Sequence, residues 1–240
     1  MSPAAEASPK AGLSVVVPAY NEEMLIEDMV TDLLETGRRW TGALEVIIVN
    51  DGSSDRTAEI IDRLAREHEG VRAMHQTQNR GFGAAVRMGL ENAAHDLVTF
   101  CPADHRFSDK EFEVYLTLIK HADAVIGYRR ERRRHQKLYP WLVSQVYHAL
   151  VNVLFCQDLY DVNWIHMYHR DQLPDFLGAS DGVFFLAETI IRAKRRGLNV
   201  VGVDVGYARR EAGGATGRKP GTIVETLREM AVFFFKRSSA

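Results

Sequence analysis

"LEVIIVNDGSSDRTAEIIDRLAREH", residues 44–68, contains one complete unit of the pattern that predicts the fold class. It begins with a run of apolar, largely β-branched residues and continues through a turn rich in Asp, Gly and Ser. It closes with apolar residues at the spacing of an amphipathic helix, with Asp55 and Glu59 in the early turns. The stretch therefore predicts a buried strand, a turn and a helix, in that order.

The same unit recurs on both sides of this stretch. "LSVVVPAYNEE", residues 13–23, leads into a helical pattern that runs up to Gly37, and residues 71–107 supply a strand, a Gly-containing loop, a helix and another strand. Alternating strands and helices with continuous apolar strands indicate an α/β fold, a mostly parallel central sheet with helices on both faces. In such sheets ligands bind beyond the carboxyl ends of the strands.

The second half of the chain continues the alternation with longer helices. The pattern predicts a helix over 109–122, a strand over 122–128, a long apolar helix over 138–155, a strand with a turn over 161–173, a helix over 184–198 capped by Gly197, and a late strand over 199–210. We expect a disordered leader over 1–12, one domain over 13–220 and a C-terminal amphipathic helix over 221–240.

Composition narrows the class of protein. The 240 residues carry a formal net charge of -2, which gives no reason to expect nucleic acid as a partner. Cys101 and Cys156 lie in apolar runs without metal-ligand spacing, which favours buried thiols in a reducing compartment. No run approaches the ~20 apolar residues of a membrane span, and the first residues lack the apolar core of a signal peptide. We therefore expect a cytoplasmic protein.

Four motifs follow one another at strand ends: "VVVPAYNEE", "IIVNDGSSDRT", "NRGFGAAVRMGLENA" and "VTFCPADHRF". In this order and spacing they resemble the family 2 glycosyltransferases of the GT-A fold. The branch that makes dolichyl-phosphate mannose and polyprenyl-phosphate sugars is the most similar. The resemblance covers residues 13 to about 218. It implies a GT-A sheet and inverting transfer of a sugar from a nucleotide-sugar donor.

The resemblance assigns residues to the donor side. The family's nucleotide-side loop is matched by Pro18, Tyr20 and Glu22, with Tyr20 placed to stack on the base. Asp51 matches the family's acidic residue that contacts the base. Its carboxylate is chemically suited to that role, because it can accept a hydrogen bond from a base imide N–H. The preceding acidic position of the family is Asn50 here. Arg80, in the Gly-containing loop, is expected beside the donor diphosphate.

"VTFCPADHRF", residues 98–107, departs from the family pattern at the metal site. Relatives carry Asp-x-Asp followed two residues later by Gln, whereas this chain has Pro102, Asp104 and Arg106. A departing nucleoside diphosphate needs positive charge, which a metal ion or a fixed cation supplies. We expect Asp104 to hold a weakly bound Mg²⁺ or Mn²⁺ while Arg106 adds charge directly. In a stricter version of this hypothesis, Arg106 replaces the metal ion altogether.

The resemblance also assigns an acceptor side. Arg129, after the strand over 122–128, matches the arginine that binds the acceptor phosphate, and Ser144 matches a position near that phosphate. A basic run follows Arg129 and suits anionic lipid headgroups; it comprises Arg130, Arg132, Arg133, Arg134 and Lys137. A late Gly-rich loop, with residues able to close over phosphates as a lid, contains Arg209, Arg210 and Arg218.

The catalytic requirement depends on the acceptor. A phosphate monoester is largely ionised at neutral pH and can attack without a base, whereas a hydroxyl needs a carboxylate to take its proton. For that role the sequence offers Asp161 first and Glu188 second. Asp161 is retained from the family, but the Gly, Phe and cation that follow it there are Ile165, His166 and Met167 here.

The sequence is compatible with three functions. The first is inverting transfer from a UDP or GDP sugar to a polyprenyl phosphate. The second is transfer to a hydroxyl of a soluble small-molecule or natural-product acceptor. The third is a catalytically degenerate protein that only binds nucleotide sugars. Phe233, Phe234 and Phe235 beside Lys236 and Arg237 suit either a peripheral contact with the inner face of the membrane or packing on the body or a second subunit of a homodimer.

Overall fold

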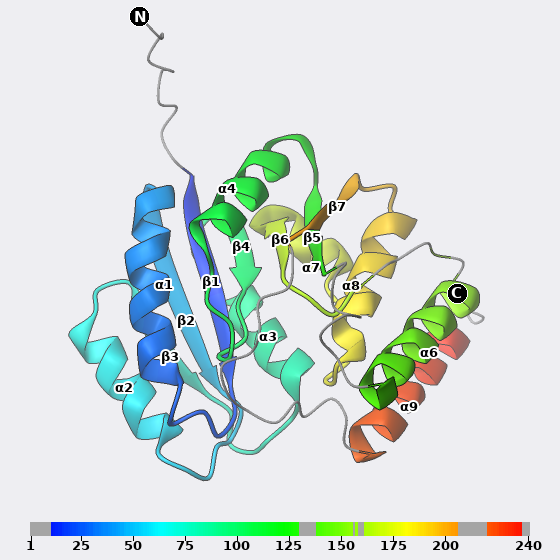
Figure 1. Cartoon of the computed structure of the whole chain (residues 1–240), viewed down its shortest axis with the longest axis horizontal. Helices are drawn as coiled ribbons and strands as arrows, with labels where there is room; N and C mark the ends of the chain where they lie inside the picture. Colours follow the sequence, from blue (N-terminus) through cyan, green and yellow to red (C-terminus); the bar gives the residue numbers. More distant parts are fainter. Residues whose placement is uncertain (1–10, 130–137, 156, 158–160, 206–219, 237–240) are drawn as a thin grey trace, which may run out of the picture.

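A computed structural model describes residues 11–129, 138–155, 157, 161–205 and 220–236. Its core is one seven-stranded sheet with the order β3-β2-β1-β4-β6-β5-β7 (Figure 1). In that order the strands are β3 Val71–His75, β2 Ala43–Asn50, β1 Gly12–Ala19, β4 Leu97–Phe100, β6 His166–His169, β5 Ala124–Tyr128 and β7 Val200–Asp204. Only β6 runs antiparallel to its neighbours, β4 and β5, so the predicted mostly parallel sheet is confirmed.

Helices cover both faces of the sheet, as predicted. They are α1 Ile26–Trp40, α2 Thr57–Glu67, α3 Phe82–Glu91, α4 Asp109–Leu118, α6 Leu138–Phe155, α7 Leu173–Phe176, α8 Phe184–Arg195 and α9 Pro220–Lys236. Side chains alternate between the two faces of β1: Val15 and Val17 pack with α1, α2 and α4, whereas Val16 packs with α3 and α8. The central strands β1, β2 and β4 are therefore buried on both sides, which explains their continuous apolar sequences.

Among the boundaries that differ from the sequence pattern, two belong to helices α1 and α2. Helix α1 continues past Gly37 to Trp40, because Gly37 provides room for Leu44 and does not end the helix. Helix α2 begins at Thr57, so Asp55 precedes it; the Asp55 carboxylate accepts hydrogen bonds from the backbone N–H and hydroxyl of Thr57 at 3.0 and 2.6 Å. Asp55 precedes the N-cap residue Arg56, and its side chain satisfies a backbone donor that the helix leaves open.

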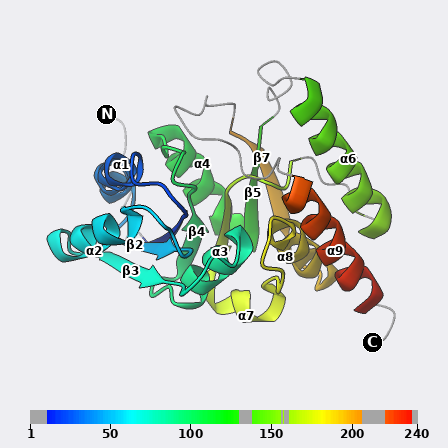
Figure 2. The same ribbon diagram turned by 90° about the horizontal axis from the view of Figure 1, so that it is seen from below.

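Helices α6 and α9 lie side by side at the end of the molecule opposite α1 and α2 (Figures 1 and 2). A separate apolar cluster joins them to α8, with the ring of Phe155 at 5.4 Å from Phe233 and 5.7 Å from Phe184. The predicted C-terminal helix therefore packs on the body through Phe233 and Phe234, while Phe235 is exposed.

Several expectations concern parts of the chain that the structure does not describe. Most of the 1–12 leader, the basic run from Arg130 to Lys137, Cys156 and the late loop with Arg209, Arg210 and Arg218 lie outside the described residues. Cys101 is buried, as expected. Within the described ranges no helix has the length and apolar character needed to cross a membrane.

Candidate active site

Hydrogen bonds join the loop after β1 to the loop after β2. Asn21, with a φ of 55°, accepts a hydrogen bond from Ser54 N at 2.8 Å through its side-chain oxygen, and its own N–H donates to Ser53 Oγ at 3.0 Å. Glu22 N donates to Thr57 Oγ1 at 2.9 Å. The "NDGSSD" turn therefore fixes the loop that carries Tyr20, which remains 41% exposed and accessible for stacking.

Asp51 connects this pair of loops to the third one. It is buried after β2, and its carboxylate accepts hydrogen bonds from Arg80 N at 2.7 Å and Gly81 N at 2.9 Å. Burial raises the pKa of Asp51 above its ordinary value, although these two N–H groups act in the opposite direction. Gly52, at a φ of +65°, leaves no space for a side chain against Gln78. The base contact predicted for Asp51 stays a prediction, because both carboxylate oxygens already hold the Arg80 loop.

Arg80 lies two residues before α3, and its side chain is half exposed. Its guanidinium contacts Asp181 at 3.2 Å, and Arg87 binds the other oxygen of the same carboxylate. Burial alone raises the pKa of Asp181, but the hydrogen bonds from Arg87 and Arg80 hold it below its ordinary value. The sequence reasoning missed Asp181 and Arg87. The small-residue turn at 178–182 before α8 was the signal that could have indicated a residue fixing α3.

Asp104 lies just beyond the end of β4 and is partly buried. Among the residues that the structure describes, no three His, Cys, Asp or Glu side chains gather as a ready-made metal cage. One carboxylate at the carboxyl end of a strand nevertheless fits Mg²⁺ or Mn²⁺, because such ions commonly take one or two protein carboxylates and complete their shell with substrate phosphates and water. Asp104 is the residue that would hold the ion.

Arg106, in the same loop, contacts helix α1. Its guanidinium forms an ion pair with Asp32 of α1, and both side chains are less than half exposed. The proposed contribution of Arg106 to the donor diphosphate stays a prediction, and it requires this ion pair to rearrange.

On the acceptor side the structure brings together two predicted residues. Arg129 Nε donates to Asp161 Oδ2 at 3.1 Å, and both side chains are less than a tenth exposed. The guanidinium also donates to Asn163 O at 3.3 Å and lies 3.9 Å from the centre of the Trp164 ring. His148 Nε2 stands 3.8 Å from the second oxygen of Asp161. Arg129 is thus a preoriented cation at the end of β5.

Ser144 lies on α6, four residues before His148, so the two side chains share one side of the helix. Because His148 reaches Asp161, Ser144 lies on the side of α6 that faces Asp161. The sequence reasoning did not single out His148. No motif marks it, since only the packing of α6 brings it near Asp161.

Glu188, the second candidate base, has structural partners. Its buried carboxylate accepts from Ser180 N and Oγ at 2.8 and 2.6 Å and from Arg192 Nε at 2.8 Å. Although burial raises the pKa of Glu188, the bonds from Ser180 and Arg192 keep it below its ordinary value. These contacts make Glu188 an anchor of the 178–182 turn and argue against proton abstraction by it.

His166 and His169 lie on β6, three residues apart, and each has its own hydrogen-bond partners. His166 is fully buried and bonds Val162 O and Tyr168 Oη, and His169 donates to Ile119 O. Burial lowers the pKa of His166 to about 3, so the imidazole is neutral. The two histidines therefore have separate structural roles.

A sheet of this order, with the nucleotide-side loops and a strand-end carboxylate at one edge, defines the class of GT-A glycosyltransferase folds. The chain belongs to glycosyl transferase family 2, whose family model matches residues 14–177. The resemblance inferred from the four motifs is thereby confirmed.

Curated relatives include glycosyltransferase AglD of Haloferax volcanii, 30% identical over 82% of this chain and 33% of its own length. The dolichyl-phosphate beta-glucosyltransferase of Drosophila melanogaster is 38% identical over 42% of this chain and 33% of its own length. The undecaprenyl-phosphate 4-deoxy-4-formamido-L-arabinose transferase of Photorhabdus laumondii is 27% identical over 84% of this chain and 61% of its length. The chain thus spans between a third and two thirds of these relatives.

Solved structures share the fold. Glucosyl-3-phosphoglycerate synthase from Mycobacterium tuberculosis, in complex with Mn²⁺, UDP and phosphoglyceric acid, superposes with a TM-score of 0.71 at 20% identity, covering 93% of this chain and 78% of its own. Mannosyl-3-phosphoglycerate synthase from Rubrobacter xylanophilus gives a TM-score of 0.74 at 18% identity, covering 96% of this chain and 76% of its own. At these identities the likeness concerns the fold alone.

Proposed function

We propose that this chain is an inverting glycosyltransferase that moves a sugar from a nucleotide-sugar donor, UDP- or GDP-linked, to a polyprenyl-phosphate-type acceptor. The observation that carries the proposal is the buried, preoriented Arg129 after β5. Since β6 is antiparallel to both β4 and β5, those two strands point the same way. Arg129 and Asp104 therefore lie at the same edge of the sheet, where an acceptor phosphate and a donor diphosphate must meet.

The reaction needs little chemistry from the protein. An oxygen of the ionised acceptor phosphate forms the bond to the anomeric carbon while the bond from that carbon to the diphosphate breaks, and the nucleoside diphosphate leaves with the electron pair. A Mg²⁺ or Mn²⁺ ion held by Asp104 would supply positive charge to the leaving diphosphate. Arg129 offsets the charge of the attacking phosphate and orients it. No general base is required for this acceptor, which fits the engagement of Asp161 with Arg129.

The surface of α6 and α9 supports a lipid acceptor. Large exposed apolar side chains gather on these two helices: Leu142, Val146, Val153, Val224, Leu227, Val232 and Phe235. Helix α6 contains no charged residue, and the basic run in the sequence directly precedes it. Apolar side chains flanked by cations suit the interface of an anionic membrane. Peripheral binding to the cytoplasmic face of a membrane is thus part of the proposal.

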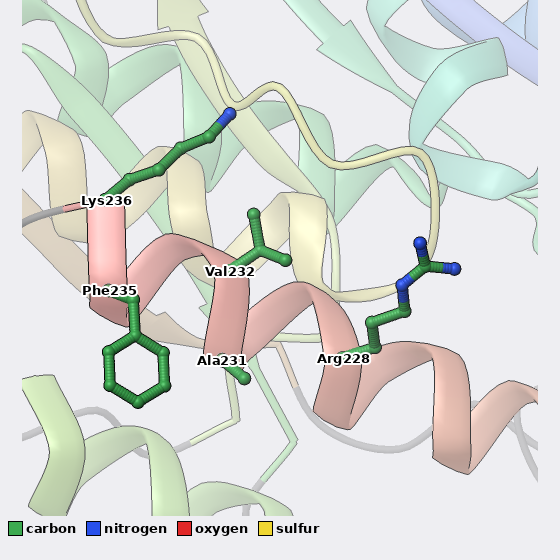
Figure 3. Close-up of a pocket in the computed structure, with 5 residues that line it drawn as sticks. All are labelled: Arg228, Ala231, Val232, Phe235 and Lys236. Carbon is green, nitrogen blue, oxygen red and sulfur yellow. The ribbon is translucent and has the colours of Figure 1, made fainter.

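Helix α9 carries such a combination near its end (Figure 3). A shallow pocket of about 460 Å³ is lined by Arg228, Ala231, Val232, Phe235 and Lys236. Phe235 projects away from Lys236 in this view, which places the aromatic ring and the cation on different sides of the helix. A homodimer through this surface is the competing outcome.

The test is sugar transfer with a panel of UDP and GDP sugars, offering a short polyprenyl phosphate, with Mn²⁺ and with excess chelator. Lipid-linked product is the expected result. Nucleotide-sugar binding with transfer only to a soluble hydroxyl compound would contradict the lipid acceptor, and binding without any transfer or donor hydrolysis would indicate a degenerate enzyme.

A further inference from the structure

The indole of Trp164 contacts residues from both predicted parts of the candidate site. The ring of His105 meets it in an edge-to-face arrangement, with ring centres 4.7 Å apart and planes at 74°. The guanidinium of Arg129 also stacks over it, with Cζ 3.9 Å from the ring centre. Trp164 is buried and therefore held in place by its neighbours. One side chain thus touches both the residue that follows Asp104 and the cation proposed for the acceptor.

The His105 ring is held by a carboxylate of helix α4. Its Nε2 lies 3.0 Å from Glu111 Oε1, and both side chains are a tenth exposed or less. The other oxygen of Glu111 accepts from Ser108 N and Oγ in the capping box that begins α4. Burial raises the pKa of Glu111, but its bonds to His105 and Ser108 hold it below the ordinary value. A buried, fully bonded carboxylate of this kind defines the position of the imidazole.

The Trp164 end is fixed as well. Tyr115 of α4 donates to Ile165 O at 2.8 Å, and Gly127 N donates to the same carbonyl at 2.9 Å. Gly127 must lack a side chain, because a Cβ there would collide with the Tyr115 hydroxyl and the Trp164 ring. Helix α4 therefore supports both ends of the arrangement, His105 through Glu111 and Trp164 through Tyr115.

We propose that His105 and Trp164 are positioning residues that hold Arg129 in register with Asp104, so that acceptor phosphate and donor meet at reacting distance. This rests on the proposed function. Reacting atoms must approach to about 3–3.5 Å, and a misplacement of about 1 Å can cost roughly 100-fold in rate. Removing either ring should therefore lower kcat and raise the acceptor KM more than it weakens donor binding.

The experiment is a double-mutant cycle of His105→Ala, Trp164→Leu and the double variant. Each single variant should lose about tenfold in kcat/KM for the acceptor and keep nucleotide affinity within about twofold. The double variant should lose no more than the worse single variant, since the residues act as one unit. Trp164→Phe, which keeps an aromatic face, should recover most of the activity. Losses that multiply in the double variant would overturn the proposal.

Stability has to be separated from positioning. Phe107→Leu is the matched control, because Phe107 is as buried as His105 and the centres of their rings are 5.9 Å apart. The other ring contacts of Phe107 are with Phe112 and Tyr115. Phe107→Leu should lower the urea midpoint as His105→Ala does and leave kcat unchanged. A kinetic loss in Phe107→Leu equal to that of His105→Ala would attribute the effect to folding and reject the proposal.

A second readout does not need turnover. The chain has three tryptophans, so Trp40→Phe combined with Trp141→Phe leaves Trp164 as the single emitter. UDP or GDP with Mn²⁺ should shift its emission when His105 is present and not in His105→Ala. Lack of transfer by the wild type would refute the proposed function alone, whereas an equal shift with and without His105 would refute the positioning role alone.

Discussion

Arg129 and Asp161 form a buried ion pair, with Nε 3.1 Å from Oδ2, between the end of β5 and the segment that leads into β6. The two residues are 32 positions apart in the sequence and were assigned to opposite roles, phosphate binding and proton abstraction. Their contact shows that Asp161 orients Arg129, which favours phosphate binding over proton abstraction in the proposed function.

Arg129→Ala should abolish transfer to a phosphate acceptor and destabilise the fold. Removing one partner of a buried pair leaves an uncompensated charge and costs about 3–5 kcal/mol. Urea unfolding and transfer assays measure the two effects. The double variant Arg129→Ala/Asp161→Ala should regain part of the stability but none of the activity. If it regained activity, Arg129 would have no role in acceptor binding.

Asp104→Asn should lower turnover at least about 100-fold and raise the Mn²⁺ concentration needed for the remainder, because the amide is a weaker ligand for a hard cation. A metal titration of activity is the measurement. Asp109→Asn, an exposed carboxylate near the same loop that pairs with Arg39, is the control and should behave as wild type. Full wild-type turnover in excess chelator would eliminate the metal.

Asp32→Asn tests whether the charge of Arg106 is needed at the diphosphate. It removes the ion pair and leaves Arg106 intact, at a cost of at most about 1 kcal/mol for a pair this exposed. If Arg106 serves the donor, Asp32→Asn should preserve or increase turnover at limiting metal, while Arg106→Ala should reduce it several-fold. Equal, wild-type rates for both variants would limit Arg106 to a structural contact with α1.

His166 makes stability depend on pH. Burial lowers its pKa from 6.5 to about 3, so the unfolded chain binds a proton that the folded chain does not. The stability that the neutral His166 contributes to the folded state is fully present above pH 6.5 and is lost as the pH falls toward 3. Over that range the folding equilibrium constant falls by up to about tenfold per pH unit. Urea midpoints from pH 7 to 4 should fall less steeply for His166→Gln than for wild type. Tyr168→Phe, which keeps the imidazole, should retain the steep dependence, and equal slopes for wild type and His166→Gln would contradict the assignment.

Val146→Asp and Val153→Asp should weaken binding to vesicles that contain anionic lipid, since each places a carboxylate on the exposed face of α6. Co-sedimentation with vesicles measures this, and a several-fold loss is expected. Met24→Asp is the control, because Met24 is 84% exposed but lies outside α6 and α9. Wild-type vesicle binding by the α6 variants, together with loss of a dimer, would instead identify a protein interface.

The sequence predicted most of the secondary structure, because apolar periodicity and turn residues are local signals. It did not reveal that β6 is inserted between β4 and β5, since pairing between distant strands leaves no local mark. The donor and acceptor residues could be nominated from motifs, but not their partners. Asp32 lies 74 residues before Arg106, and Trp164 lies 59 residues after His105, so only the folded chain brings them together.

Glu229 of α9 accepts a hydrogen bond from Gly182 N at 2.7 Å, and the neighbouring Asp181 binds Arg80 at the donor edge. Two adjacent residues of one turn thus connect the helix proposed to rest on lipid with the arginine proposed to meet the diphosphate. A tilt of α9 would pull on Gly182 and shift Arg80 with it. Under the proposed function, this turn would couple attachment of α9 to a membrane with the position of Arg80 beside the nucleotide.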